Sequence, residues 1–263
     1  MNDPERPSKR PAADSGGATG SYPPAPPGNP GNPGSADLRG EGARSWAELR
    51  RIGIFGGSFD PVHVGHLYVA STAQAARALE RVVFVPARVP PHKPEQVLAS
   101  GSDRIAMLEI ALRGHPDWTI DALELERAGP SYTIDTLREL RGRYGLHPDA
   151  RLYLLLGSDN LRGFAHWKDV GLLLELALPV VVAREKELEP LIASLGRELP
   201  QTQAARLERA LIACEPLEIS STEIRESLAR GRVPSESLPA GVAEYIVSRG
   251  IYGTRTRLPA PPG

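Results

Sequence analysis

The chain has 263 residues, with 31 Lys and Arg against 32 Asp and Glu, and 41% of its residues are hydrophobic. This length suffices for one sizeable core, and a net charge of -1 argues against a dedicated nucleic-acid binder, which shows a basic excess. A single cysteine excludes an internal disulfide framework and favours the reducing cytoplasm. The longest apolar run, 172–183, is interrupted by Glu175 and Pro179, so it is too short for the roughly 20 apolar residues of a membrane span.

Residues 1–48 are predicted to form a disordered tail. Pro and Gly occupy 17 of the first 44 positions, and large apolar side chains are rare there. Such a segment cannot bury enough apolar surface to offset the entropy of ordering it. It contains no apolar stretch of a secretory signal, and its acidic residues argue against an organelle transit peptide. We assign the tail no function and expect one folded domain over 49–255, followed by a frayed C-terminus over 256–263.

Short apolar runs alternate with helical stretches along the folded part. Strands are predicted at 51–55, 81–87, 119–125, 150–156, 178–183 and 216–219. Helices are predicted at 64–79, 102–113, 133–144, 222–230 and 242–249, with Ile105, Leu108 and Leu112 on the buried face of the second. Residues 201–215 are ambiguous, and we assign them to a helix. The alternation predicts an α/β fold with a doubly wound parallel sheet, whose ligands bind at the carboxyl ends of the strands.

The first strand leads directly into two glycines and two histidines. Gly56 and Gly57 let backbone N–H groups approach a ligand, and the N-terminus of the next helix points its partial positive charge at the same space. His63 and His66 lie three residues apart, on one face of the first helical turn. This set suits a polyanion such as a triphosphate. A simple turn, structural histidines or part of a metal site are the alternatives, but no further Cys/His cluster has metal-ligand spacing. Neither a dinucleotide fingerprint nor a P-loop motif is present.

The segment GGSFDPVHVGH at 56–66 resembles the H-x-G-H signature of the nucleotidylyltransferase superfamily. Within that superfamily the chain is similar to bacterial nicotinate-nucleotide adenylyltransferases, because further stretches match in the same order. These are PPHK (90–93), GPSYTIDTL (129–137), LLGSDNLRGFAHWKDV (155–170), ISSTEIR (219–225) and VAEYIVSRGIY (242–252). The resemblance spans about residues 51–253 and implies the Rossmann-like nucleotidylyltransferase fold.

The resemblance also implies a reaction, the transfer of the adenylyl group of ATP to nicotinate mononucleotide in NAD biosynthesis. The products are nicotinate adenine dinucleotide and pyrophosphate. The phosphate of the mononucleotide is already an anionic nucleophile, so the site needs alignment and charge stabilisation rather than a general base. No metal site built from protein side chains is expected. Mg²⁺ would arrive with ATP and keep mostly water and phosphate ligands.

By resemblance, four side chains stabilise charge at the ATP phosphates: His63, His66, Lys93 and Arg225. The remaining expected ATP contacts are Gly56, Gly57, Ser58, Phe59, Gly65, Gly157, Asp159, Ile219, Ser220, Ser221 and Thr222. Ser58 and Phe59 would offer backbone N–H groups, and a β-carbon at Gly65 would crowd the phosphate.

Several of these residues also have a purely local explanation. Lys93 lies in a loop stiffened by prolines, and without the resemblance it fits a solvated surface lysine. Asp159 fits an N-cap of a short helix, and Ser220 with Glu223 fits a capping box. Arg225 is harder to explain locally, because an arginine in the first helical turn opposes the helix dipole unless an anion is present.

The resemblance places the nicotinate mononucleotide at a second group: Ser58, Lys93, Thr133, Trp167 and Lys168. The flat face of Trp167 suits stacking on a pyridine ring, with core packing as the alternative. Lys168 stands where the family commonly has an aromatic residue. It either attracts the nicotinate carboxylate or points to water, so the choice between nicotinate and nicotinamide mononucleotide stays open.

Other functions are also compatible with part of the pattern. A non-catalytic sensor of ATP or a pyridine nucleotide would keep the pocket but lose a phosphate ligand, whereas all four charged candidates are present here. Superfamily members that transfer cytidylyl groups or act on phosphopantetheine lack support from the SYTIDTL and Trp167 segments. A scaffold role of the tail has no support in its composition. Neither the oligomeric state nor a role for residues 184–214 follows from the sequence, and neither nucleic acid nor a membrane is an expected partner.

Overall fold

A computed structural model describes residues 44–89, 99–161, 163–214, 217 and 219–254. Three predictions therefore lie outside the described residues: most of the N-terminal tail, the frayed C-terminus, and the loop that carries Lys93. Residues 44–48, which we included in the tail, are described and pack on the domain. A 3-10 helix spans Trp46–Glu48, and the Trp46 ring stacks on Tyr144 with the ring centroids 4.0 Å apart. The domain thus includes residues before 49, because this aromatic contact anchors them.

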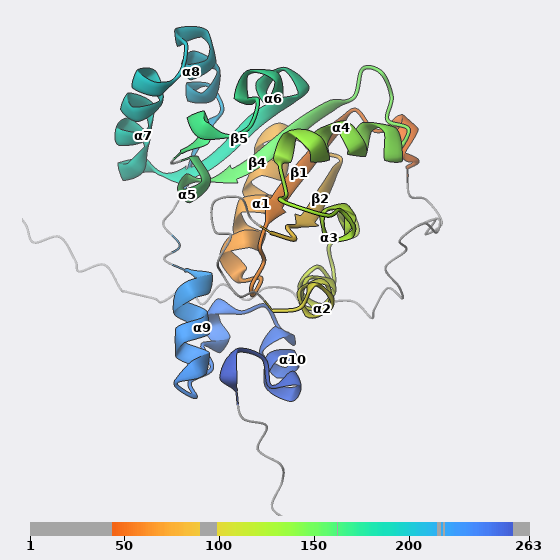
Figure 1. The fold of residues 1–263 in the computed structure, drawn as a ribbon, viewed down its shortest axis with the longest axis vertical. Helices are drawn as coiled ribbons and strands as arrows, with labels where there is room; N and C mark the ends of the chain where they lie inside the picture. The colour runs from red at the N-terminus through yellow and green to blue at the C-terminus, as the bar shows by residue number, and fades with distance from the viewer. Residues whose placement is uncertain (1–43, 90–98, 162, 215–216, 218, 255–263) are drawn as a thin grey trace, which may run out of the picture.

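One sheet of six parallel strands forms the centre of the described chain (Figure 1). The strands are β1 (Arg51–Gly57), β2 (Arg81–Pro86), β3 (Trp118–Ile120), β4 (Arg151–Gly157), β5 (Ala177–Arg184) and β6 (Leu211–Cys214). Their spatial order is β3-β2-β1-β4-β5-β6. This is the doubly wound parallel sheet that the sequence predicts, with the strand order reversing between β1 and β4. Ligands of such sheets bind outside the carboxyl ends of the strands at that point.

Helices connect these strands and cover both faces of the sheet. They are α1 (Val64–Arg77), α2 (Gly101–Ala111), α3 (Leu123–Glu126), α4 (Thr133–Arg143), α5 (Ser158–Leu161), α6 (Val170–Leu176), α7 (Glu185–Glu198), α8 (Gln201–Glu208), α9 (Ser221–Ala229) and α10 (Val242–Arg249). Short 3-10 helices span Phe164–His166, Ser235–Ser237 and Ile251–Gly253. In Figure 1, α9 and α10 lie together at the lower end of the molecule, away from α7 and α8.

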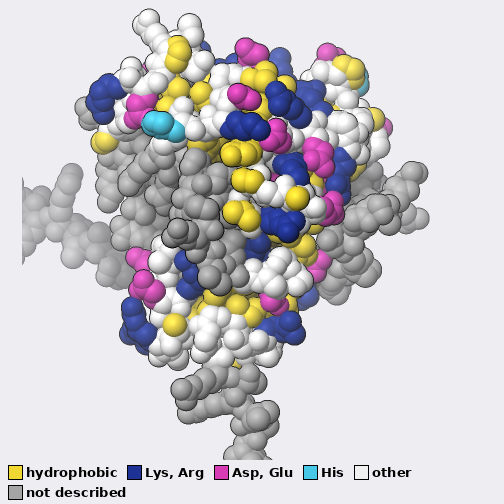
Figure 2. All heavy atoms as spheres, viewed as in Figure 1, with side chains coloured by type: hydrophobic (Ala, Val, Ile, Leu, Met, Phe, Trp, Pro, Cys, Tyr) yellow, Lys and Arg dark blue, Asp and Glu magenta, His cyan; other side chains and the backbone are white. Residues whose placement is uncertain are grey.

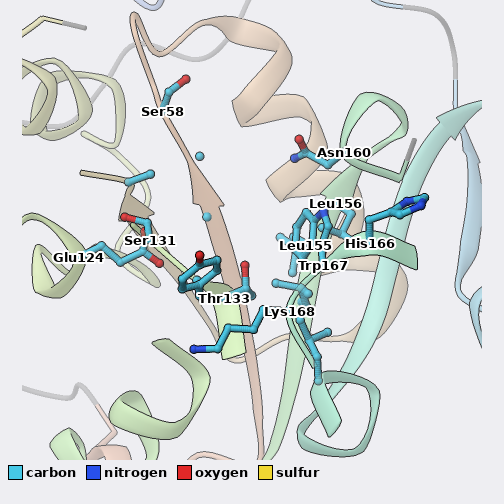
Figure 3. A pocket seen from close by; sticks show the side chains of 16 residues that line it. Ser58, Glu124, Ser131, Thr133, Leu155, Leu156, Asn160, His166, Trp167 and Lys168 are labelled. Atoms are coloured by element: carbon cyan, nitrogen blue, oxygen red, sulfur yellow. The ribbon is translucent and has the colours of Figure 1, made fainter. Parts of the chain in front are cut away.

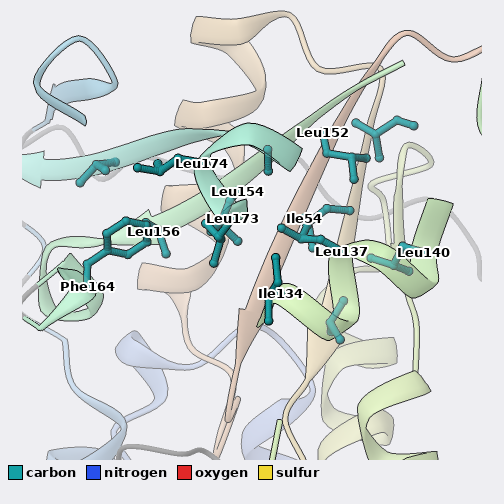
Figure 4. Packing of buried hydrophobic residues seen from close by; sticks show 14 of the residues in the cluster. Ile54, Ile134, Leu137, Leu140, Leu152, Leu154, Leu156, Phe164, Leu173 and Leu174 are labelled. Atoms are coloured by element: carbon teal, nitrogen blue, oxygen red, sulfur yellow. The ribbon is translucent and has the colours of Figure 1, made fainter. Parts of the chain in front are cut away.

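Two hydrophobic clusters hold the layers together, one on each face of the sheet. Alternate strand residues point to opposite faces, so Ile54 and Val83 belong to one cluster, whereas Phe55 and Phe84 belong to the other. The first cluster packs under α4 and α6 (Figure 4), and the second packs against α1, α2, α9 and α10. Burial of both faces explains why β1, β2, β4 and β5 are continuous apolar runs.

Three predictions about individual elements are wrong in detail. The strand predicted at 119–125 ends at Ile120, because the Asp121 carboxylate accepts the backbone N–H of Leu123 and starts α3. The helix assigned to 201–215 is confirmed only for α8, Gln201–Glu208, because residues 211–214 form the strand β6. Of the predicted strand 216–219, the two described residues, 217 and 219, lie outside any strand. In α2, Ile105 is only half-buried, and the Arg104 guanidinium occupies the buried face instead.

The surface of the described chain mixes both signs of charge. Figure 2 shows Lys and Arg side chains interspersed with Asp and Glu on the face that it draws, in keeping with the balanced composition. Among the helices of the described residues, none is long and apolar enough to cross a membrane.

Candidate active site

A cavity of about 200 Å³ opens at the carboxyl ends of β1, β2 and β4, where the strand order reverses. It is lined by Gly56, Gly57, Ser58, Ala87, Glu124, Ser131, Tyr132, Thr133, Leu154, Leu155, Leu156, Asn160, His166, Trp167, Lys168 and Leu173. Figure 3 shows Trp167 and His166 on one side, with Glu124 and Ser131 on the opposite side. The cavity therefore brings together six predicted site residues from three separate stretches of the sequence: Gly56, Gly57, Ser58, Thr133, Trp167 and Lys168.

The predicted stacking residue, Trp167, is half-buried at the wall of this cavity. Its ring packs on the buried Phe164 at a centroid distance of 5.1 Å and an interplanar angle of 44°. Thr133 begins α4, and the backbone N–H groups at the start of a helix have no partner one turn earlier in the helix. An aromatic wall beside backbone donors fits a flat ring that carries a carboxylate.

Lys168 lines the same cavity but already has partners. Its ammonium lies 3.0 Å from the Asp135 carboxylate and 4.6 Å from the centroid of the Tyr132 ring. The side chain thus spans from the segment after the Phe164–His166 3-10 helix to α4, and its attraction to the nicotinate carboxylate stays a prediction. Both charged groups are partly exposed, so their attraction is modest.

The two predicted catalytic histidines form a stacked pair beside the end of β1. The ring centroids of His63 and His66 are 3.7 Å apart, at an interplanar angle of 28°. His63 is the residue before α1, and its backbone N–H donates to Nδ1 of His66 over 3.2 Å. Because Nδ1 of His66 accepts, the proton of the neutral ring sits on Nε2, where it can be donated to a ligand.

Burial holds both histidines in the neutral form. It lowers the pKa of His63 from 6.5 to about 4, and burial together with the charge of His63 lowers the pKa of His66 well below its usual value. A stacked pair of imidazoles resists holding two protons, because two cations at this distance repel. A nearby anion would oppose both effects, because it favours the protonated form of an imidazole.

Gly65 and Phe59 fix the position of these rings. A β-carbon at Gly65 would lie 3.0 Å from Nδ1 of His63, so the clash is with the imidazole itself and not only with a bound phosphate, as the sequence suggested. Phe59, predicted for its backbone N–H, has a fully buried ring 5.0 Å from His66, and its φ of 47° is uncommon for a residue other than glycine. This backbone conformation turns the ring inward, where it supports the histidine.

The ISSTEIR segment packs directly on the loop between β1 and α1, as the predicted ATP site requires. The Ile219 β-carbon lies 3.8 Å from where a Gly65 β-carbon would be, and Ser221 Oγ donates to the Pro61 carbonyl over 3.1 Å. Ser220 is the N-cap of α9, but its Oγ accepts from the Thr222 N–H rather than from Glu223.

Arg225 extends from α9 into the same loop. Its Nη1 donates to the Asp60 carbonyl over 2.7 Å, and its Nη2 donates to Thr222 Oγ1 over 3.2 Å. Ile224 and Leu228 are buried, as predicted, so Arg225 projects from another side of the helix. The guanidinium therefore has partners even without an anion.

The structure gives less information on the remaining predicted residues, Gly157, Asp159 and Lys93. Gly157 is the last residue of β4, and Asp159 lies inside α5, so its predicted N-cap role is wrong. Lys93 lies outside the described residues.

Among the lining residues that had no predicted role are Glu124, Ser131, Tyr132 and Asn160. Three of them belong to stretches that carry the family resemblance, so a role could have been sought there. Glu124 fell in the segment interpreted as a strand. Burial raises the pKa of Glu124, and its carboxylate accepts a hydrogen bond from Thr136 Oγ1 over 2.5 Å.

Comparisons with known proteins agree with this geometry. A family model described as cytidylyltransferase-like matches residues 54–227. A protein named probable nicotinate-nucleotide adenylyltransferase from Geobacillus thermodenitrificans is 39% identical over 207 residues, covering 78% of this chain and 88% of its own. One of the same name from Thermomicrobium roseum is 38% identical, covering 78% of this chain and 93% of its own.

The chain belongs to the nicotinate-nucleotide adenylyltransferase family. Solved structures share its fold at lower identity. A nicotinic acid mononucleotide adenylyltransferase of Plasmodium falciparum, complexed with NaAD, has a TM-score of 0.61 and 20% identity over 78% of this chain and 98% of its own. A putative member of the family from Vibrio parahaemolyticus has a TM-score of 0.55 and 18% identity over 80% of this chain and 98% of its own. The Rossmann-like nucleotidyltransferase fold predicted from the sequence is confirmed.

Proposed function

We propose that this chain transfers the adenylyl group of ATP to nicotinate mononucleotide and releases pyrophosphate, a step of NAD biosynthesis. One observation carries the proposal beyond family membership. The cavity walled by Trp167 and the start of α4 extends to Gly56, Gly57 and Ser58 at the end of β1, and the chain leads from there to the stacked histidines. A mononucleotide bound by its pyridine ring there would direct its phosphate toward the histidines.

In this proposal one group of residues binds the ATP phosphates and a second group stabilises the charge that develops on them. Gly56 and Gly57 at the end of β1, Ser58 and Phe59 in the following loop, and Gly65 in the first turn of α1 would receive the ATP phosphates. His63, His66 and Arg225, with Lys93, stabilise charge on the α-phosphate and on the leaving pyrophosphate. Because the attacking phosphate is already anionic, the site has to hold two polyanions in line rather than remove a proton.

The remaining predicted residues would contact the nucleoside parts of the two substrates. Ile219, Ser220, Ser221 and Thr222 would contact adenine, with Gly157 and Asp159 beside the ATP ribose. Thr133, Trp167 and Lys168 would surround the nicotinate ring.

Mg²⁺ would enter this reaction with ATP. The described residues contain no group of three or more His, Cys, Asp or Glu side chains that could hold a metal ion. The donors beside the predicted phosphate site are two imidazoles and a guanidinium, which suit phosphate oxygens better than Mg²⁺. We therefore propose that the ion is bound by the phosphates and water. From the single cysteine we also propose that the enzyme acts in the cytoplasm.

The experiment is an incubation of the full-length protein with ATP, Mg²⁺ and either nicotinate or nicotinamide mononucleotide, followed by chromatography of dinucleotide and pyrophosphate. We expect fast dinucleotide formation from the nicotinate form and equal amounts of pyrophosphate. Faster use of nicotinamide mononucleotide would change the substrate assignment. Binding of ATP with no product from either mononucleotide would replace the enzyme with a nucleotide sensor.

A further inference from the structure

Asp60 is the most completely buried charged residue beside the candidate site, with 0% of its surface exposed. It lies in the loop between β1 and α1, three residues before His63. Its Oδ1 accepts two hydrogen bonds, from the Tyr252 hydroxyl over 2.6 Å and from the Ala99 N–H over 3.0 Å. These donors come from the C-terminal 3-10 helix and from the segment before α2, so one carboxylate oxygen ties three distant parts of the chain together.

The second oxygen, Oδ2, is buried and accepts no hydrogen bond from the described residues. Nη1 of Arg225 lies 3.8 Å from it, and the same Nη1 donates to the Asp60 backbone carbonyl. A buried carboxylate oxygen without a donor is costly unless a nearby cation offsets its charge. Arg225 supplies that charge, and the pairing holds the guanidinium at the loop.

A second arginine lies on the other side of this loop. The Arg104 guanidinium is buried, and its Nη1 donates to the carbonyls of Ser58 and Ala87, each over 2.8 Å. The charge of Asp60 favours the protonated form of Arg104, although burial lowers the pKa of that guanidinium. Arg104 therefore fixes the loop ends after β1 and β2 and adds positive charge near Asp60, while Arg225 is the arginine within 4 Å of Oδ2.

We propose that Asp60 is a positioning residue for the reaction, because its buried carboxylate sets the orientation of the Arg225 guanidinium toward the ATP phosphates. Tyr252 and the Ala99 N–H hold the carboxylate so that Oδ2 faces Arg225. The hydrogen bond to the Asp60 carbonyl uses one edge of the guanidinium and leaves other N–H groups for an anion. The inference rests on the proposed function, in which Arg225 contacts ATP.

Asp60→Asn tests the proposal because it preserves the shape of the side chain. The amide oxygen can still accept from Tyr252 and Ala99, while the amide nitrogen replaces Oδ2 and no longer attracts Arg225. Turnover number and KM for each substrate are measured in the wild type, Asp60→Asn, Arg225→Met and the double variant. We expect Asp60→Asn to lower kcat/KM for ATP by about 10- to 100-fold, and by less than about threefold when Arg225 is already Met. An equal loss in both backgrounds would overturn the proposal.

Tyr252→Phe is the matched control, since it removes one donor to the same carboxylate and leaves the charge that faces Arg225. We expect it to lower the melting temperature at least as much as Asp60→Asn does, with only a few-fold change in kcat/KM for ATP. If both variants lose stability and ATP use in parallel, Asp60 is a structural cross-link and the proposal is wrong.

Two further measurements keep the test decisive. Should Asp60→Asn fail to fold, Asp60→Glu is used in the same four-protein comparison, because it keeps the charge but displaces it by one methylene. Should the wild type form no dinucleotide, the proposed reaction fails by itself. The ATP dissociation constants of the same proteins, measured by calorimetry, then still show whether the effect of Asp60 depends on Arg225.

Discussion

The two halves of the candidate site are built in different ways. The phosphate half, around the loop between β1 and α1, consists of buried groups that fix one another: Phe59 under His66, Gly65 against His63, and Asp60 facing Arg225. The pyridine half is lined by Trp167 and Lys168, which are half-buried or exposed. Substitutions in the first half should therefore impair turnover, whereas substitutions in the second should alter the choice of mononucleotide.

The largest effect is expected for His63→Ala. Turnover should fall by a factor of about 100 or more, because a donor placed at developing charge is lost while the hydrophobic clusters stay intact. Steady-state kinetics measure this, and circular dichroism checks the fold. Near-normal turnover would remove His63 from the mechanism.

The phosphate half should also make stability depend on pH. Burial lowers the pKa of His63 from 6.5 to about 4 in the folded state, so only the unfolded chain takes up a proton between these values. The contribution of His63 to stability is therefore complete above about pH 6.5 and declines as the pH falls toward 4, by about 2 kcal/mol between pH 7 and pH 5. Urea unfolding at both pH values measures the decline, and His63→Gln should reduce it by that amount. An unchanged decline in the variant would assign it to other groups.

A smaller effect is expected from the ion pair in the pyridine half. Asp135 already neutralises Lys168, so Lys168→Met should change the preference for nicotinate over nicotinamide mononucleotide by less than about threefold. Asp135→Asn should free the ammonium and raise that preference by up to about fivefold. Competition between the two mononucleotides gives both ratios. If Lys168→Met abolishes the preference, the lysine holds the carboxylate despite its partner.

No effect on turnover is expected from deleting residues 1–43. This deletion retains Arg44, which pairs with Glu80, and the stack of Trp46 on Tyr144. The matched deletion of residues 1–48 should lower the melting temperature, because it removes both contacts. A large loss of turnover in the shorter deletion would give the tail a functional role.

Much of the fold could be predicted from local pattern. The buried strands are continuous apolar runs, and the glycines and histidines after β1 appear as one contiguous motif. The position of α3 was missed because Asp121, whose carboxylate accepts from the first N–H of that helix, lies inside a stretch that alternates like a strand. The role of Asp60 was missed for another reason: its partners Ala99, Arg225 and Tyr252 are far away in sequence, and only tertiary folding brings them to one carboxylate.

The division between the two halves is tested most directly by one ratio, kcat/KM for nicotinate mononucleotide over that for nicotinamide mononucleotide, measured in His63→Ala and Trp167→Ala. We predict that His63→Ala lowers both values by the same large factor and leaves the ratio within about twofold of the wild type. Trp167→Ala should instead raise KM for the mononucleotides and shift the ratio, with a smaller change in kcat. A shifted ratio in His63→Ala, or an unchanged ratio with a large loss of kcat in Trp167→Ala, would contradict the division.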